Sequence, residues 1–292
     1  MSPTEPSTGT VRYAPLTRLP GWLLAPGLAW LGVFFFIPLL LVFAISFAAR
    51  GTYGGVEWTF SLSNYVTLLD PLYLKIFVRS LALALVTTSG CLLLGFPLAY
   101  YVARAPLRRQ GIWLLLVMIP FWTNFLVRTY AWMFILRTEG LMNTVLLDLG
   151  LIADPIEILY GDGAILIGLV YGYLPFMVLP LYAALVRLDY ALVEAAWDLY
   201  ASGWNVFWRV ILPLAKPGVI AGCILVFIPS LGAFITPDLL GGARSMMVGN
   251  LIQHEYLVVR DWPFGSAISF VLMALVVLGM MVYFRVEKVE RW

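Results

Sequence analysis

Charged residues are scarce in this chain of 292 residues: Asp, Glu, Lys and Arg together make up 12% of it. Soluble domains carry about 25%, so a solvated globule is excluded. Histidine occurs once, at His254, and cysteine twice, at Cys91 and Cys223, each inside an apolar run. A histidine–cysteine metal cluster is therefore not expected, and we expect the two thiols to pack as small apolar side chains.

A phosphate-binding loop is also missing. The lysine of the G-x-x-x-x-G-K-[ST] pattern follows a glycine, whereas none of Lys75, Lys216 and Lys288 does. The chain is therefore expected to be no enzyme and to bind no nucleotide cofactor. Energy for any active process has to enter from another subunit.

Apolar residues are abundant instead, at 62% of the chain with a mean hydropathy of +0.93. They come in blocks of about twenty or more, the helix length that crosses about 30 Å of hydrocarbon, and they lack the alternation of membrane β-strands. We expect an all-α, multi-pass membrane protein with six spans. The expected order is a tail at 1–20, spans at 22–47, 76–102, 112–136, 164–186, 219–235 and 264–284, a folded loop at 187–217, and a tail at 285–292.

A cleaved signal peptide is the alternative for the first span, but the apolar stretch at 22–47 is far longer than an h-region of about 7–15 residues. Orientation follows from lysine and arginine placement, because these residues favour the cytoplasmic side. With both termini inside, the inner side holds Arg12, Arg18, Arg104, Arg108, Arg109, Arg187, Arg209, Lys216, Arg285, Lys288 and Arg291. The outer side holds six basic residues. Both termini and the 187–217 loop are therefore expected in the cytoplasm.

The loop between spans four and five is too polar to cross a bilayer and too apolar for a solvated linker. Trp197, Trp204, Phe207 and Trp208 stand at near-helical spacing, which indicates short amphipathic helices. Ser202-Gly203 offers a turn between them. Composition alone leaves two interpretations open: a helix lying on the membrane surface, or a segment that another protein binds.

The sequence EAAWDLYASGWNVFWRVILP at 194–213 resembles the EAA loop of permeases from bacterial ABC importers. Glu194, Ala195, Ala196, Leu212 and Pro213 match its pattern. Tyr200 stands where the family has glycine and Val210 where it has isoleucine, so we expect Gly203 to take part of the bend. The resemblance implies a type I importer permease whose coupling helix docks in a groove of an ATPase. The implied coupling residues are Glu194, Ala195, Ala196, Asp198, Gly203, Leu212 and Pro213.

Four further segments resemble spermidine/putrescine importer permeases of the PotB type. They are PFWTNFLVRTYAW at 120–132, LPFMVLPLY at 174–182, DLLGG at 238–242 and RDWPFG at 260–265. The resemblance implies import of a polyamine across the bacterial inner membrane. It also implies a second permease subunit, two copies of an ATPase that binds ATP and Mg²⁺, and an extracytoplasmic binding protein. No nucleic acid partner is expected.

A polyamine pathway needs carboxylates and aromatic faces for its ammonium groups. The candidate pathway residues are Trp122, Asn124, Tyr130, Tyr171, Tyr173 and Asp238. Trp and Tyr also gather at membrane interfaces without any ligand. The acids of the 137–162 loop, Asp162 among them, are expected either to attract cations or to reflect charge asymmetry alone. Arg128 lies within the third span, where we expect it to snorkel or to pair with an acid.

Two alternatives to this interpretation are open, one of the same class and one of a different class. One is an importer of the same build for another solute, such as an organophosphonate or an opine-like compound. The other is a self-sufficient secondary transporter or channel, which predicts ionisable relay residues inside the spans. Apart from Arg128 the expected spans hold almost none.

Overall fold

The computed structural model describes residues 24–242 and 245–289, and its secondary structure is almost wholly α-helical. Five helices are long and apolar enough to cross a membrane, or six if one bent pair counts as a single span. This agrees with the expected all-α membrane fold. The tail at 1–20 and the end of the tail at 285–292 lie outside the described residues.

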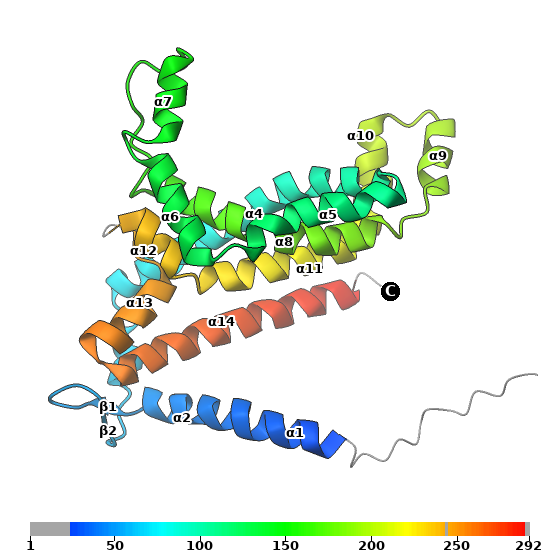
Figure 1. The fold of residues 1–292 in the computed structure, drawn as a ribbon. Coiled ribbons are helices and arrows are strands. Elements are labelled where there is room, and N and C mark those ends of the chain that lie inside the picture. Colours follow the sequence, from blue (N-terminus) through cyan, green and yellow to red (C-terminus); the bar gives the residue numbers. More distant parts are fainter. Residues whose placement is uncertain (1–23, 243–244, 290–292) are drawn as a thin grey trace, which may run out of the picture.

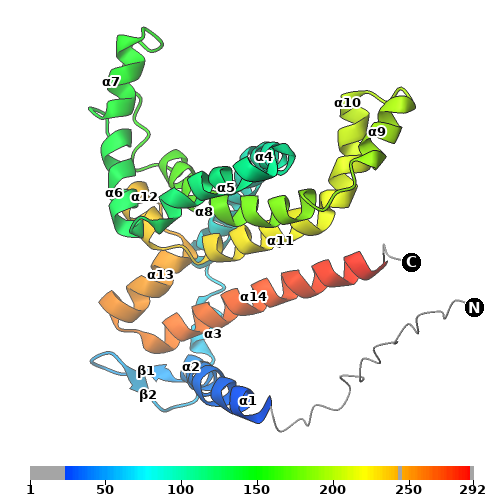
Figure 2. The same cartoon turned by 45° about the vertical axis from the view of Figure 1, so that its right-hand side comes forward.

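Three long helices form the core of the molecule. They are α4 (Pro71–Arg104), α8 (Asp162–Leu185) and α11 (Leu212–Leu231). The three run side by side in both ribbon views (Figure 1, Figure 2). Their shared interior is filled by fully buried side chains that include Cys91, Met177 and Val226. Cys91 thus packs as a small apolar residue, as expected.

α11 can approach α8 closely because it carries two glycines four residues apart. A Cβ at Gly218 would lie 2.6 Å from the Cβ of Ala184, and a Cβ at Gly222 would lie 2.6 Å from the sulfur of Met177. Small residues at this spacing allow close contact between membrane helices. The α8–α11 contact therefore leaves no room for a larger side chain at either glycine.

A second layer lies beside the core and consists of the N-terminal helices and the last helix (Figure 2). Its elements are α1 (Ala25–Leu31), the π-helical turn η3 (Gly32–Phe36), α2 (Ile37–Ser46) and α14 (Trp262–Val289). α2 packs on α14 through Phe43 and Phe270, whose ring centroids are 5.0 Å apart. Most other side chains of α1 and α2 face outward, as lipid-facing side chains do.

A small hairpin and a short helix connect the two layers. β1 (Ala49–Arg50) pairs antiparallel with β2 (Val56–Glu57), and α3 (Ser63–Thr67) then leads into α4. Asn64 fastens α3 to the end of α2, because its side-chain amide donates to the carbonyls of Ser46 and Ala48 at 3.0 and 2.9 Å.

The expected third span at 112–136 is not one helix. α5 (Leu107–Trp122) ends and α6 (Phe125–Leu136) begins after a break, and the chain bends there by 88°. Thr123 and Asn124 are extended, and the Asn124 side chain accepts from the backbone N–H of Leu126 at 2.9 Å. This cap starts a new helix in a new direction. α7 (Leu141–Asp148) continues the arm.

The expected loop at 187–217 is also shorter than predicted. α9 (Ala191–Asp198) is followed by a turn, and α10 (Gly203–Val206) and the π-helical turn η4 (Phe207–Ile211) then run directly into α11. Pro213 and Pro217 therefore lie inside a helix. Pro213 follows directly on η4 inside this continuous helix, so its missing N–H removes one hydrogen bond of the helix. The wider π-helical turn ahead of it relieves the clash that a proline ring makes with a preceding carbonyl.

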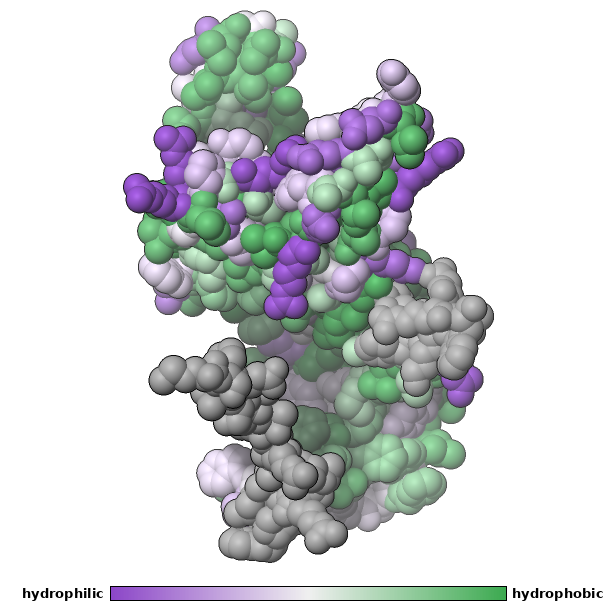
Figure 3. All heavy atoms as spheres, turned by 90° about the vertical axis from the view of Figure 1, so that its right-hand side faces the viewer, coloured by the Kyte–Doolittle hydropathy of each residue, from purple (hydrophilic) through white to green (hydrophobic). Residues whose placement is uncertain are grey.

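The core helices separate two ends of the molecule (Figure 1). At one, the α9 end, lie α9, α10 and the C-terminal end of α14. At the other, the α12 end, lie α12 (Ile235–Gly241), α13 (Val248–His254), the π-helical turn η6 (Glu255–Val259) and the hairpin. Figure 3 looks at the α9 end, where hydrophilic side chains gather over its upper half among apolar ones. Span five ends at Leu231 rather than at residue 235, because Gly232 and Ala233 separate α11 from α12.

The close packing of α11 on α8 yields a first prediction. Gly222→Leu is expected to destabilise the purified permease by about 1–3 kcal/mol, the usual cost of overpacking a core. Gly279→Leu is the matched control, because nothing lies within 4 Å of a Cβ at that position of α14. Thermal unfolding in detergent compares the two, and equal melting temperatures would contradict the packing described.

Candidate functional site

α9 presents one face to the core and another to solvent. Asp189 starts it, since its carboxylate accepts from the Ala191 N–H at 3.0 Å. Val193 is fully buried, whereas Glu194 and Asp198 are exposed. Residues four apart lie on the same side of a helix. The two carboxylates therefore form an acidic, solvent-facing edge, as expected from the sequence.

The turn after α9 lies at Tyr200 and not at Ser202-Gly203, which corrects the expectation. Tyr200 has a φ of 57°. Its N–H donates to the carbonyl of Trp197 at 2.8 Å, and the N–H of Ala201 donates to the carbonyl of Ala196 at 3.1 Å. This pair of bonds is a Schellman motif, in which the left-handed residue is usually glycine. The tyrosine thus adopts the backbone geometry that the family glycine would supply.

Ser202 and Gly203 begin the next helix instead of making the bend. The Ser202 hydroxyl accepts from the Asn205 N–H at 3.4 Å as the N-cap of α10, and Gly203 is the first residue of that helix. Serine is favoured at this position because its oxygen satisfies a free N–H of the first turn. The role expected for Gly203 is therefore a helix start.

The segment 191–213, which we call the EAA segment, is joined to the core by apolar contacts. Val193, Val206 and Ile211 belong to the same buried cluster as Met177 and Leu181 of α8. The rings of Phe207 and Phe96 meet edge to face, with centroids 5.3 Å apart. Leu212 and Ala196 pack against this cluster, whereas Ala195 and Pro213 are exposed. These contacts join α9 and α10 to α4 and α8 through one continuous buried cluster.

A polar contact that the sequence did not predict reinforces this joint. The Arg104 guanidinium lies over the ring of Tyr190 at 4.7 Å and donates to the Tyr100 hydroxyl at 3.2 Å. Nearby, the Tyr182 hydroxyl donates to the Gln110 side-chain oxygen at 2.8 Å, and the Gln110 amide donates to the Ala105 carbonyl at 2.8 Å. These bonds hold the α4–α5 turn against α8 and the start of α9.

Arg128 contacts the break in the third span. Its guanidinium donates to the Pro120 carbonyl at 2.8 Å and lies over the rings of Phe125 and Tyr171, at 5.3 and 5.7 Å. Within the described residues no acid lies within ion-pairing distance of it, so the expected pairing with an acid is wrong. At the break the Pro120 carbonyl accepts from two side chains, the Thr123 hydroxyl at 2.7 Å and the Arg128 guanidinium. Tyr171 also meets Trp132 edge to face at 5.3 Å.

The six candidate pathway residues have different surroundings in the structure. Asn124 caps α6, and the Tyr173 hydroxyl donates to the Pro229 carbonyl at 3.2 Å, so both have structural contacts. Trp122 and Tyr130 are 69% and 46% exposed. Asp238 is exposed on α12. Tyr171 contacts Arg128 and Trp132, and Tyr173 packs against the buried core.

Asp162 is not a free acid of the outer loop. It pairs with Arg79 of α4, which also donates to the Ser245 hydroxyl at 2.9 Å. This ion pair joins the start of α8 to α4 across 83 residues of sequence. An expectation that counted Asp162 among cation-attracting acids is therefore corrected. The sequence did not predict this pair, because Arg79 and Asp162 are 83 residues apart.

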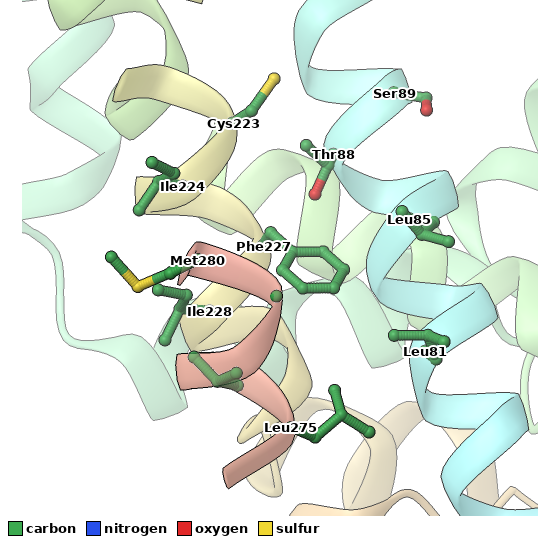
Figure 4. A pocket seen from close by; sticks show the side chains of 12 residues that line it. Leu81, Leu85, Thr88, Ser89, Cys223, Ile224, Phe227, Ile228, Leu275 and Met280 are labelled. Atoms are coloured by element: carbon green, nitrogen blue, oxygen red, sulfur yellow. The ribbon is translucent and has the colours of Figure 1, made fainter. Parts of the chain in front are cut away.

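An apolar groove of about 470 Å³ lies between α4, α11 and α14. Figure 4 shows Leu81 and Leu85 on one side and Ile228 and Leu275 on the other, with Phe227 between them. Thr88, one of its few polar residues, donates to the Ala84 carbonyl of its own helix at 2.7 Å. With no carboxylate in its lining, this groove cannot neutralise an ammonium group. Among the described residues no three metal-binding side chains gather either.

The family described as "Binding-protein-dependent transport system inner membrane component" matches residues 94–290. The chain belongs to this family. The spermidine/putrescine transport system permease protein PotB of Escherichia coli (strain K12) is 45% identical over 259 residues, which cover 89% of this chain and 94% of that protein. PotB of Haemophilus influenzae is 45% identical over 260 residues, covering 89% and 91%.

A solved structure shares the fold. The crystal structure of a bacterial alginate ABC transporter, in complex with an alginate pentasaccharide-bound periplasmic protein, contains a chain that matches with a TM-score of 0.68 at 17% identity. The match covers 92% of this chain and 96% of that one. The permease is thus a multi-pass inner membrane component of a binding-protein-dependent ABC importer and not an enzyme, as expected. Membership also decides against a self-sufficient secondary transporter.

The Arg128 contacts yield a second prediction for this permease. Arg128→Met is expected to lower the free energy of unfolding by about 1–3 kcal/mol, because it removes a charge-assisted hydrogen bond to the Pro120 carbonyl and the contacts of the cation with two aromatic rings. Arg137→Met, at the exposed far end of α6, is the matched control and is expected to change little. Thermal unfolding measures both, and an unaffected Arg128→Met protein would contradict a structural role.

Proposed function

We propose that this permease imports polyamines, spermidine and putrescine. The observation that carries the proposal is 45% identity to PotB proteins over 89% of the chain. The identity is measured over 259 residues, far more than the EAA segment alone. A separate binding protein on the outer side would deliver the substrate to the α12 end.

We further propose that a separate ATPase, in two copies, docks on the EAA segment and binds the ATP and Mg²⁺. This chain would bind no cofactor of its own. Three features support the assignment: the acidic edge of Glu194 and Asp198 is open to solvent, the segment is packed firmly on α4 and α8, and lysine and arginine placement favours a cytoplasmic α9 end with both termini inside. A segment that only rested on lipid would gain nothing from carboxylates, since the cytoplasmic leaflet is itself anionic.

A second permease subunit would complete the pathway. The groove between α4, α11 and α14 is apolar and does not suit a cation. The face of α5 and α6 is open and aromatic, and it includes Trp122 and Tyr130. α5 has 16 residues and spans about 24 Å, less than the bilayer core of about 30 Å. We infer that the pathway runs between the two permeases, with Tyr171 and Asp238 among the residues near it.

The substrate proposal predicts that spermidine or putrescine, with its binding protein, stimulates ATP hydrolysis by the complex reconstituted in liposomes. Aromatic faces attract ammonium groups, so linear polyamines are expected to outrank neutral solutes of similar length. An organophosphonate and an opine serve as comparison solutes in the same panel. Stimulation by either of these, without stimulation by a polyamine, would contradict the substrate and leave the importer class intact.

The docking proposal predicts that Glu194→Lys abolishes transport and prevents the ATPase from copurifying, while the permease remains folded in the membrane. A lysine would place a cation at the edge where the ATPase meets an acid. Glu57→Lys is the matched control, since Glu57 is an exposed acid of the hairpin at the α12 end. Ala196 is a poorer position for testing, because it packs on the core cluster. Normal uptake by Glu194→Lys would contradict the docking site.

A further inference from the structure

Tyr200 holds a backbone conformation that its side chain disfavours. Its φ of 57° lies in the left-handed region, which side chains other than glycine and asparagine enter at a cost. Two other residues share this feature, Tyr160 and Arg260, and each has a long-range backbone bond to support it. The Tyr160 N–H donates to the Leu240 carbonyl at 2.8 Å, and the Arg260 carbonyl accepts from the Gly55 N–H at 2.9 Å. Tyr200 has only the bonds of its own turn.

Among the described residues, the phenol ring of Tyr200 makes no packing contact that would compensate for this strained backbone. Tyr200 is 98% exposed, and the preceding Leu199 is 82% exposed. Trp204, on the first turn of α10, is 70% exposed. Three large apolar side chains thus stand on the tip between α9 and α10, where an isolated chain would be more stable with glycine or asparagine. A strained residue that its own chain does not need is best explained by a contact made elsewhere.

The position of the tip argues for a protein and against lipid as that contact. The tip lies beyond the ends of the core helices, between α9 and α10 (Figure 1, Figure 2). The exposed edge of α9 that leads to it carries Glu194 and Asp198, which an anionic membrane surface would repel. A partner protein with an apolar pocket would accept the side chains of the tip. Basic or backbone N–H groups on the rim of that pocket would pair with the acidic edge of α9.

We propose that Tyr200 is an anchor for the ATPase subunit, with its ring and the Leu199 side chain seated in an apolar pocket of the docking groove. The left-handed turn points the ring away from the core, and the acidic edge of α9 lies on the rim. Buried tyrosines are frequent among the few residues that dominate an interface. This inference rests on the proposed docking of the ATPase, and it identifies the side chain that contributes most to binding.

The test compares four variants of the permease complex in nanodiscs for affinity toward the ATPase and for melting temperature. Tyr200→Gly is expected to keep or raise the melting temperature, because it relieves the turn, and to weaken ATPase binding by about tenfold or more. Tyr200→Phe keeps the ring and is expected to bind as the native protein does. Tyr53→Gly is the matched control, since Tyr53 is fully exposed on the hairpin at the α12 end, and Glu194→Lys reports on the docking site.

Two results would overturn the inference. Native affinity in Tyr200→Gly would show that the ring makes no contact, and a lower melting temperature would show that it supports its own fold. If Glu194→Lys loses the ATPase while Tyr200→Gly retains it, the anchor is wrong and the docking site stands. If both variants bind the ATPase normally, the docking site itself is wrong.

Discussion

The close contact between α8 and α11 is the constraint on which the rest of the structure depends. Gly218 and Gly222 admit Ala184 and Met177 of α8, and no larger residue fits at either glycine. The same buried cluster continues without interruption into Val193 and Val206 of the EAA segment. The EAA segment, where we propose that an ATPase binds, is therefore packed as an extension of the transmembrane core. Arg104 and Gln110 add polar contacts at the junction.

The broken third span shows how a polar residue is kept inside a membrane protein. At the bend of 88°, Asn124 caps the new helix, and Thr123 and Arg128 both donate to the Pro120 carbonyl. The Arg128 charge lies over two aromatic rings. The polar backbone groups at the break, the Leu126 N–H and the Pro120 carbonyl, are thus hydrogen-bonded by nearby side chains. A cation held in this way needs no acid to balance its charge.

Hydropathy predicted the class, the approximate positions of the spans and the polar segment between the fourth and fifth, because burying apolar blocks needs only composition and length. Hydropathy did not predict the directions in which the helices run. Hydropathy averaged over a window of residues does not detect the bend after Trp122, because that bend depends on the N-cap at Asn124. The loop was expected to extend to residue 217, but the π-helical turn at Phe207–Ile211 runs directly into α11, so the helix already includes Pro213 and Pro217. The Arg79–Asp162 pair and the left-handed Tyr200 depend on residues distant in sequence or on a turn that overrides propensity.

The continuous buried cluster implies that the EAA segment and the core move as one body. Spin labels at Ala195 on α9 and Leu179 on α8, placed after Cys91 and Cys223 are replaced by alanine, report the distance between the two parts. The measurement compares nucleotide-free and ATP-trapped complexes, with a second label pair on the ATPase confirming that it closes. If the segment and the core are one rigid body, the distance between residues 195 and 179 stays unchanged when the ATPase closes. A distance that shifts with ATP would show that the segment moves independently of the core, and would contradict the claim.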